Sequence, residues 1–418
     1  MARRYFKVAT FNVRNLISAG VTYYNTNRYS EAAYDRKVDW LAEQLYRMDA
    51  DVVCLQETFD EAPLVDLMAR YRALVEARES KNKANKSRYK HLWHLPNIDT
   101  SDDFPLPGLA ILSRNKIHEQ VAIQDISADP IEIEPDDGLA YSLSKLSRPL
   151  QAARIELPEG VSGWFFNAHL KSKRPKYPTG SIAEDEENFQ FFERAQGSFR
   201  SLALRAGEAL ALRRAVLDKL VGSDDPVFVL GDLNDEMGAV TTEMVAGEMP
   251  FRAWDFDVKQ RYWDVELYSA VRSHLRRTEE SSIYTHIFNG HYGTIDHVLI
   301  SQEFYYRNPG RIGDVHFVEV FNDHLIDNSV VGAPSQGEAS DHGQVVVRCS
   351  IDTERLEARA TGEFEIFRDG DNKFRFRLKA ANGRVIAESQ AYRTRADVRK
   401  GIESVRNHAR NADIDDVT

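Results

Sequence analysis

The stretch VFVLGDLN at residues 227–234 decides the fold class, because in it an apolar run ends abruptly in polar side chains. Its first five residues, 227–231, are apolar and rich in β-branched and aromatic types, which indicates a buried strand. Asp232 and Asn234 follow directly. A strand that is buried on both faces hides its middle, so functional side chains must project from its end or from the adjoining loop.

The same arrangement recurs along the chain, with a polar side chain at the end or the start of an apolar run. Strand-like runs occupy residues 5–11, 51–55, 109–112, 151–157, 164–168, 227–231, 295–300 and 343–349. The polar residues beside them are Asn12, Glu57, His169, Asp232, Asn234, Asp296, Asp341 and His342. So many placements of this kind predict a single site that is assembled from several strand ends.

Helical segments lie between some of these runs. In residues 31–48, apolar side chains recur at helical spacing, and Ser30 is a suitable N-cap. Residues 192–221 form a longer segment rich in Ala, Leu and Arg that ends near Gly222. Strands mixed with helices, without any internal repeat, predict a layered α/β or α+β domain.

Length and composition are those of an ordinary globular protein. The chain has 418 residues, of which 42% are hydrophobic and 28% charged. No apolar run approaches the roughly 20 residues that a membrane-spanning helix needs. Near the start, two arginines lead straight into the strand-like run, without the apolar stretch of a signal peptide. We therefore expect a cytoplasmic protein without a membrane partner.

The charge is unevenly distributed. The net charge is −11, but residues 355–418 hold 14 Lys and Arg against 11 Asp and Glu, so residues 1–354 carry a net −14. Non-specific DNA binding depends on basic side chains that neutralise phosphates. The acidic body therefore counts against a tight, processive DNA binder.

Two segments are predicted to be surface insertions. Residues 78–91 carry six basic side chains, which indicate either a phosphate-contacting arm or a solvated loop. Residues 172–190 contain Lys173, Arg174 and Lys176, followed by an acidic run at residues 184–187.

The two cysteines, Cys54 and Cys349, lie inside apolar runs and are expected to be buried thiols.

The polar residues also suit one another chemically. Oxygen ligands from Asn12, Glu57 and Asp341 suit a hard cation such as Mg²⁺ or Mn²⁺. A carboxylate such as Asp232 can deprotonate or orient water, and a histidine can donate to a phosphoryl or leaving oxygen. Each short motif also has a purely structural interpretation, since Gly-Asp-Leu-Asn is a reasonable turn. The joint occurrence of these motifs is what favours a functional site.

The motifs together resemble the endonuclease/exonuclease/phosphatase superfamily. They are TFNV at 10–13, LQE at 55–57, NAHLKS at 167–172, GDLN at 231–234, TIDH at 294–297 and SDH at 340–342. All are present in the order of that family, within residues 8–347. The resemblance implies a four-layer α/β/β/α sandwich of two mixed sheets, divalent metal dependence, and in-line attack of water on a phosphoester.

The resemblance also implies roles for individual residues. Glu57 is expected to be the principal metal ligand, with Asn12 near the metal and Asp341 beside the metal or its water. Asp232 is expected to activate or position the attacking water, and Asn234 to orient the phosphate.

The remaining roles concern the histidines and the substrate. His169 matches the deoxyribonuclease-type histidine that donates toward the phosphate or the leaving oxygen. Asp296 is expected to orient His342. Arg148 and Lys171 are similar to residues of bacterial members described as nucleases and are candidates for substrate binding. For Arg148, an ordinary surface position is the alternative.

The C-terminal part resembles the small YegP-like domain, on the segments at residues 362–367, 374–383 and 402–405. Its pattern predicts a three-stranded meander and a helix near 394–410, with Asn382-Gly383 in one turn. The predicted organisation is a catalytic domain at 1–352, a linker at 353–361 and the small domain at 362–418. This unit either pairs with a second chain as a homodimer or docks against the catalytic body.

Three functions follow from these observations. The first is a divalent-metal-dependent nuclease that hydrolyses phosphodiester bonds of DNA or RNA. The second is a phosphatase or phosphodiesterase for a small phosphoester, such as a metabolite or a lipid headgroup, which the acidic body keeps open. The third is a catalytically silent binding module. The complete motif set argues against the third.

Overall fold

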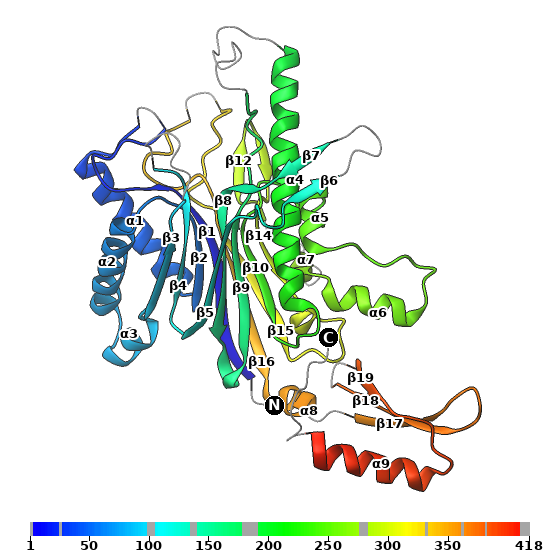
Figure 1. The fold of residues 1–418 in the computed structure, drawn as a ribbon. Helices are drawn as coiled ribbons and strands as arrows, with labels where there is room; N and C mark the ends of the chain where they lie inside the picture. Colours follow the sequence, from blue (N-terminus) through cyan, green and yellow to red (C-terminus); the bar gives the residue numbers. More distant parts are fainter. Residues whose placement is uncertain are drawn as a thin grey trace.

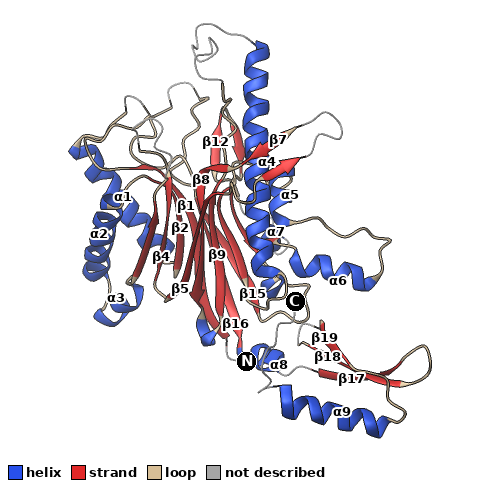
Figure 2. Cartoon of the chain, in the orientation of Figure 1, coloured by secondary structure: helices blue, strands red, loops and turns tan. Residues whose placement is uncertain are grey.

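The computed structural model describes residues 3–24, 27–97, 105–133, 140–177, 191–275, 283–330, 333–360, 363–380 and 383–409. Two six-stranded mixed sheets pack face to face, and helices cover their outer faces (Figures 1 and 2). This is the four-layer α/β/β/α sandwich that the sequence predicts. A small β-rich unit with one helix follows at the C-terminus.

The first sheet has the strand order β15-β16-β1-β2-β4-β3. Its strands are β1 (Arg3–Leu16), β2 (Val52–Thr58), β3 (His91–Leu95), β4 (Gly108–Ser113), β15 (Gly313–Phe321) and β16 (Gln344–Asp352). Helices α1 (Glu31–Met48), α2 (Ala62–Arg78) and α3 (Lys81–Ser87) accompany it. The predicted N-cap of α1 is confirmed, because the Ser30 side chain accepts a hydrogen bond from the Ala33 backbone N–H.

The second sheet has the order β11-β14-β10-β9-β8-β5. Its strands are β5 (Ile117–Asp125), β8 (Lys145–Glu156), β9 (Ser162–His169), β10 (Val227–Asp232), β11 (Tyr268–Ser269) and β14 (Asp296–Ile300). The helices of this half are α4 (Phe191–Leu220), α5 (Val240–Ala246), α6 (Phe256–Val265) and α7 (Ala270–Leu275). The shorter elements are β6 (Ile131–Ile133), β7 (Tyr141–Leu143), η1 (Pro158–Gly160), β12 (His286–Phe288), β13 (His291–Gly293) and η3 (Gln302–Phe304).

The main core lies between the two sheets. Phe228 of β10 stacks on Phe165 of β9, with ring centroids 4.8 Å apart and planes 9° from parallel. Cys54 and Cys349 are fully buried in the same cluster as free thiols, as predicted. Separate apolar clusters join each sheet to its helices.

Each of the eight predicted strand runs is a strand, whereas β3, β5 and β15 were not indicated by the sequence. These three strands lie at sheet edges. An edge strand is more exposed than a central one, so polar residues interrupt its apolar positions and no continuous apolar run forms.

At residues 78–91 the interpretation as a solvated loop is wrong, because the segment is partly helical, although most of its described side chains are exposed. Residues 81–87 form helix α3, and Tyr89 is buried, with its ring 5.1 Å from that of Tyr71. Lys90 N–H donates to the carbonyl of Ser113, the last residue of β4. This basic segment therefore packs at the end of the first sheet where β2 begins, whereas Glu57 stands at the end where β2 finishes.

The C-terminal unit is the predicted meander, with β17 (Glu363–Arg368), β18 (Phe374–Lys379), β19 (Val385–Glu388) and helix α9 (Arg395–His408). Asn382 of the predicted turn lies outside the described residues, as does the acidic run at 184–187. Residues 353–360 of the predicted linker form helix α8 (Thr353–Ala360). The Arg384 guanidinium lies 2.7 Å from the Asp264 carboxylate of the body.

In the described part of the chain, no helix combines the length and the apolar character needed to cross a membrane.

Candidate active site

The strand pairing of the first sheet brings its polar residues to one end. Because β1 and β2 run parallel, Asn12 lies opposite Gln56, the neighbour of Glu57. β16 runs antiparallel to β1 and starts just after His342. The end of β1, the end of β2 and the start of β16 therefore meet at the same edge.

The second sheet also brings its polar residues together at one end. Asp232 at the end of β10 lies opposite His169 on parallel β9 and opposite Asp296 on antiparallel β14. The backbones of β9 and β10 approach closely at Gly231, whose φ is +152°. A Cβ atom at this position would therefore lie only 1.9 Å from the Ala168 carbonyl oxygen. Only glycine fits next to Asp232.

Asn12 joins the two sheets at this end. Its side chain is fully buried, and Nδ2 lies 3.2 Å from Glu57 Oε1 and 3.1 Å from Asp232 Oδ2. His342 Nε2 is 3.5 Å from the same nitrogen. Asn12 Oδ1 accepts a hydrogen bond from the Arg14 backbone N–H at 3.0 Å, which fixes the orientation of the Asn12 amide. The predicted residues Asn12, Glu57, Asp232 and His342 are thus in contact.

The backbone around Glu57 is bent into an uncommon conformation. Glu57 has φ +62°, and Arg14 and Asn15 have φ +53° and +55° in a bulge of β1. The bulge turns the Asn15 N–H toward Glu57 Oε2, to which it donates at 3.0 Å. Left-handed backbone at non-glycine residues costs about 1–3 kcal/mol and tends to cluster at functional sites.

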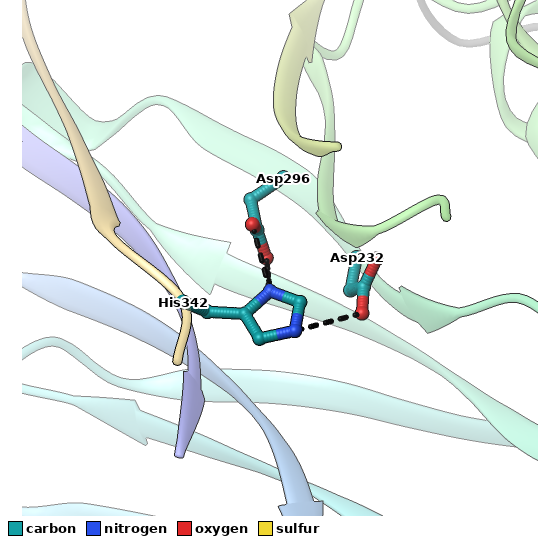
Figure 3. A group of neighbouring side chains, drawn as sticks. All are labelled: Asp232, Asp296 and His342. Atoms are coloured by element: carbon teal, nitrogen blue, oxygen red, sulfur yellow. Dashed lines mark hydrogen bonds and ion pairs between the residues drawn. The ribbon is translucent and has the colours of Figure 1, made fainter. Parts of the chain in front are cut away.

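His342 lies between two buried carboxylates, as Figure 3 shows. Its Nδ1 is 2.9 Å from Asp296 Oδ2, and its Nε2 is 3.8 Å from Asp232 Oδ2. Thr285 Oγ1 accepts the Asp296 backbone N–H at 3.2 Å and so holds that carboxylate's strand in place. Burial alone would lower the pKa of His342, but Asp296 and Asp232 outweigh it and raise that pKa well above the ordinary value. The two carboxylates therefore favour the imidazolium form of His342.

The pKa of His169 is shifted in the opposite direction from that of His342. Its Nε2 is 3.4 Å from Asp232 Oδ2, and its side chain is 2% exposed. Burial, followed by the cations of Arg148 and His342, lowers the pKa of His169 well below 6.5. Its Nδ1 is buried and makes no hydrogen bond within the described residues. The surroundings thus shift the pKa values of the two imidazoles in opposite directions.

Asp232 lies between these two histidines. Burial raises the pKa of its carboxyl group, against the lowering effect of His342. The Asn234 backbone N–H donates to Asp232 Oδ1 at 2.9 Å. A carboxylate that holds its proton more strongly than usual is a better base once ionised.

Three other predicted residues meet at the Leu170 carbonyl or beside it. Asn234 Nδ2 donates to this carbonyl at 2.9 Å, and Arg148 Nη1 donates to it at 3.3 Å. The Lys171 ammonium donates to acceptors in its own loop, Ser172 and Arg174. Asn234 and Arg148 therefore brace the segment that follows His169.

Asp341 stands apart from the buried cluster. Its carboxylate is 45% exposed and lies 3.7 Å from Arg14 Nε. Its expected place beside the metal or its water stays a prediction.

Lys37 of α1 was not predicted as a site residue, although it supports two of the site's segments. It is fully buried, and its ammonium donates to the Val13 carbonyl at 3.0 Å and the Glu338 carbonyl at 3.2 Å. Ser340 Oγ makes a parallel connection, because it donates to the Asn12 carbonyl at 2.6 Å and accepts the His342 N–H at 3.0 Å. Position 37 falls on the buried stripe of α1 with Leu41 and Met48, and this charged residue on an apolar stripe was the available signal.

Buried amides also connect the sheets below the site. Gln56 Nε2 donates to Asn167 Oδ1 at 2.7 Å, and Asn167 Nδ2 donates to Gln151 Oε1 at 2.9 Å. Thr10 Oγ1 donates to Gln56 Oε1 at 3.3 Å. These motif residues satisfy one another rather than face a substrate, so they set the separation of the sheets.

The donor set can be compared with what a hard cation needs. Glu57 Oε1 and Asp232 Oδ2 both approach Asn12 Nδ2, whereas Asn12 Oδ1 accepts the Arg14 N–H, so the oxygens gathered at this point are those of the two carboxylates and the expected Asn12 oxygen ligand is turned away. Asp232, Asp296 and His342 form a second possible group, with ligand atoms within 4.8 Å of one another. Because Nδ1 of His342 is engaged with Asp296 and the two carboxylates raise its pKa, His342 is a poor ligand. The oxygen atoms around Glu57 fit Mg²⁺ or Mn²⁺ better.

Comparison with known proteins identifies two families along the chain. Residues 9–342 match the Endonuclease/Exonuclease/phosphatase family, and residues 369–416 match a domain of unknown function, DUF1508. A UPF0339 protein of Treponema denticola is 55% identical over 56 residues, which are 13% of this chain and 97% of that protein. The UPF0339 protein YegP of Escherichia coli K12 is 46% identical over 48 residues, 12% of this chain and 44% of that protein.

Solved structures resemble the chain at low identity. A mannosyl-6-phosphatase of Bacteroides thetaiotaomicron has 15% identity and a TM-score of 0.46, with coverage of 82% of this chain and 99% of that one. The human Nocturnin catalytic domain has 14% identity and a TM-score of 0.41, with coverage of 84% and 98%. TDP2 of Caenorhabditis elegans has 14% identity and a TM-score of 0.42, with coverage of 83% and 98%.

Proposed function

The chain belongs to the endonuclease/exonuclease/phosphatase family, with a UPF0339-type unit at its C-terminus, and we propose that it is a divalent-metal-dependent nuclease. The reaction is hydrolysis of phosphodiester bonds in DNA or RNA. One observation carries this proposal. Asp232 lies between His342, whose surroundings favour the imidazolium, and His169, whose burial favours the neutral imidazole, and two hydrogen bonds through Asn12 link Asp232 to Glu57.

Glu57 would hold the metal through its carboxylate oxygens, and Asn12 would position that carboxylate, since Asn12 Nδ2 donates to Glu57 Oε1 while Asn12 Oδ1 accepts the Arg14 N–H. A bound Mg²⁺ or Mn²⁺ supplies positive charge to a phosphoryl oxygen. The bulge of β1 serves this role by holding Glu57 and Asn15 together. Asp341 is a further candidate for this set, on the exposed side.

The other residues move or hold protons. Asp232 accepts a proton from the attacking water, because burial raises its pKa and makes the carboxylate a stronger base. His342, held by Asp296, donates a hydrogen bond to a phosphoryl oxygen as charge builds there. Neutral His169 orients a phosphoryl or leaving oxygen. Arg148 and Asn234 keep the His169 segment in position through the Leu170 carbonyl.

A small phosphoester is the second candidate substrate. The observation that favours it is the net −14 of residues 1–354, which disfavours a polyanion at long range. Local cations matter more at the site itself, and Arg148 and Lys171 lie next to the His169 segment. We therefore place nucleic acid first.

A substrate panel tests this proposal. Plasmid DNA, single-stranded DNA, RNA and small phosphoesters are incubated with Mg²⁺ or Mn²⁺, and Asp232→Asn serves as the inactive control. We expect cleavage of at least one nucleic acid, which the control lacks. Turnover confined to small phosphoesters would establish the second candidate instead.

We also propose that residues 362–418 pair with the same unit of a second copy. Strand β19 is at the edge of its sheet, and its Val385 and Ile386 are 48% and 63% exposed. An exposed apolar edge strand is suited to pairing with another strand.

A further inference from the structure

Helix α4 extends past the sheets that it covers. In Figure 1 its first half rises beyond the strand ends, away from the C-terminal unit. Four large apolar side chains of this half are exposed: Phe191, Phe192, Phe199 and Leu202, at 82%, 75%, 64% and 44%. Exposed aromatic side chains gathered on one projecting helix indicate an interaction surface.

The segment that leaves the active site runs along this half of α4. The Arg205 guanidinium donates to the Lys171 carbonyl at 3.2 Å, and Ser201 Oγ donates to the Arg174 carbonyl at 2.6 Å. One turn further out, the Lys176 N–H donates to the Gly197 carbonyl at 3.0 Å. Residues 171–177 therefore run antiparallel to the helix, directly outward from His169.

Residues 171–177 and 191–202 together form what we call the α4 ridge. It contains six basic residues, Lys171, Lys173, Arg174, Lys176, Arg194 and Arg200, and one acidic residue, Glu193. All of these cations except half-buried Lys171 are exposed, and Lys173 also pairs with Asp235 of the body at 2.9 Å. The described residues of the ridge are thus positive on a body that is acidic overall, while the acidic run at 184–187, between the two segments in sequence, lies outside the described residues.

The size of the ridge suits an extended polymer. From Arg205 to Phe191 the helix rises on the order of 20 Å, at about 1.5 Å per residue. Cations and phenylalanines are interspersed over this length, beginning beside His169. Proteins that bind single-stranded nucleic acid combine these two features, because cations contact the phosphates and aromatic rings stack on the bases.

We propose that the α4 ridge binds the single-stranded portion of a nucleic acid that leads away from the scissile phosphate. The proposal rests on the proposed nuclease function and narrows its substrate. An anionic membrane would also be attracted to aromatic and basic side chains on a helix. Four of the six cations, however, lie on the segment that follows His169, an arrangement that a polymer crossing the site requires and a membrane does not.

Binding without cleavage tests the ridge separately from catalysis. A fluorescein-labelled 15-residue oligothymidylate is titrated in EDTA, and its anisotropy is measured. Phe199→Ala should weaken binding by about fivefold or more, since stacking on one aromatic ring contributes about that much or more. The matched control is Phe251→Ala, because Phe251 is 63% exposed and Phe199 is 64% exposed. The control should bind like the wild type.

The cations are tested by the salt dependence of the same titration. Replacing Arg174 and Arg200 by Ser should reduce the log–log salt slope by about 0.7 for each phosphate that the protein no longer neutralises. Replacing Lys81 and Lys83 of α3, at the other end of the first sheet, should leave the slope unchanged.

Each result of these titrations supports or contradicts the proposal that the α4 ridge binds single-stranded nucleic acid. Absence of oligonucleotide binding, or equally weakened binding in Phe199→Ala and Phe251→Ala, overturns it. Vesicles of phosphatidylserine and phosphatidylcholine form the second arm. Loss of vesicle binding in Phe199→Ala with oligonucleotide binding intact assigns the surface to a membrane and also overturns it. A protein that binds through the ridge but cleaves no phosphoester would overturn the proposed function and leave the ridge supported.

Discussion

The two ends of strand β10 are equally buried but differ in what surrounds them. Near the start, Phe228 stacks on Phe165 between the sheets, and its exposed fraction is 0%. At the end, Asp232 is 1% exposed and faces Asn12 and His342. Burial stabilises the first residue, since apolar area leaves water. The same burial destabilises the second, since a carboxylate loses its hydration.

This difference separates stability from activity along one strand. The apolar end contributes to folding whatever the chemistry. The polar end carries the desolvated carboxylate of Asp232, and the end of β2 in the facing sheet carries left-handed backbone at Glu57; both features oppose folding. Changes at the apolar end should therefore reduce stability, and changes at the polar end should reduce activity with little loss of stability.

The largest expected effect is that of metal removal. EDTA should abolish activity, and Mg²⁺ or Mn²⁺ should restore it, because the charge on the phosphoryl oxygen depends on the cation. Glu57→Ala should require far more metal for half-maximal activity while its circular dichroism spectrum stays that of the wild type. Full activity in excess chelator would refute the metal-dependent mechanism.

Asp232→Asn should follow, with a fall in kcat/KM of about 10²–10⁴-fold, the usual contribution of a positioned acid–base group. Stability should not fall with it. Because burial raises the pKa of Asp232 above its ordinary value, its ionisation destabilises the fold as pH rises past about 4. In EDTA, the Tm of the variant should therefore equal or exceed that of wild type at pH 7, and the difference should shrink near pH 4. A large drop in Tm at pH 7 would contradict the expectation that changes at the polar end of β10 reduce activity with little loss of stability.

Phe228→Ala should show the reverse behaviour. Loss of a buried phenylalanine and the cavity left behind cost about 3–5 kcal/mol of unfolding free energy. Urea denaturation measures this loss, and kcat of the folded protein should remain within about twofold of wild type. A fall in kcat as large as that of Asp232→Asn would mean that the two ends are not independent.

Lys37→Met should have a smaller effect on activity. The variant keeps the side-chain volume but removes the donor to the Val13 and Glu338 carbonyls, so Asn12 and His342 lose their alignment. We expect kcat to fall by about 10–100-fold, in line with displacements of the order of 1 Å, with KM nearly unchanged.

Amide hydrogen exchange in residues 337–342 provides a readout of Lys37 that does not depend on activity. It should accelerate in Lys37→Met. Gln44→Met, on the same helix at 4% exposure, is the matched control and should change neither kcat nor exchange. Equal changes in both variants would show that Lys37 affects the site no differently from another buried residue of α1.

The smallest effect on activity is expected from removal of residues 361–418, which leaves α8 in place. His342 forms a β-bridge with His286 of β12, and in Figure 1 this unit lies at the opposite end of the sheets from β12, so kcat should stay within about twofold. Light scattering should give a dimer for the full chain and a monomer for the shortened one. A full-length monomer at micromolar concentration would contradict association through β19.

Much of this molecule was predictable from short stretches of sequence. The interior strands were recognisable because burial on both faces demands continuous apolar runs, and their ends because polar residues interrupt those runs at once. The capped helix after Ser30 and the C-terminal meander were predictable for the same reason, since cap, turn and periodicity are local properties. The gathering of Asn12, Asp232 and His342 followed from family order and from the expectation that strand ends meet.

Tertiary structure alone decided which groups touch and what charge they carry. Asn12 and His342 lie 330 positions apart, yet their side chains are 3.5 Å from each other. The pKa of His342 is raised and that of His169 is lowered, because each pKa depends on the burial and the charges supplied by distant segments. The basic residues at 78–91 lie away from the site, and those at 171–177 lead out of it, because the direction of each chain segment is set by the strands and helix against which it packs.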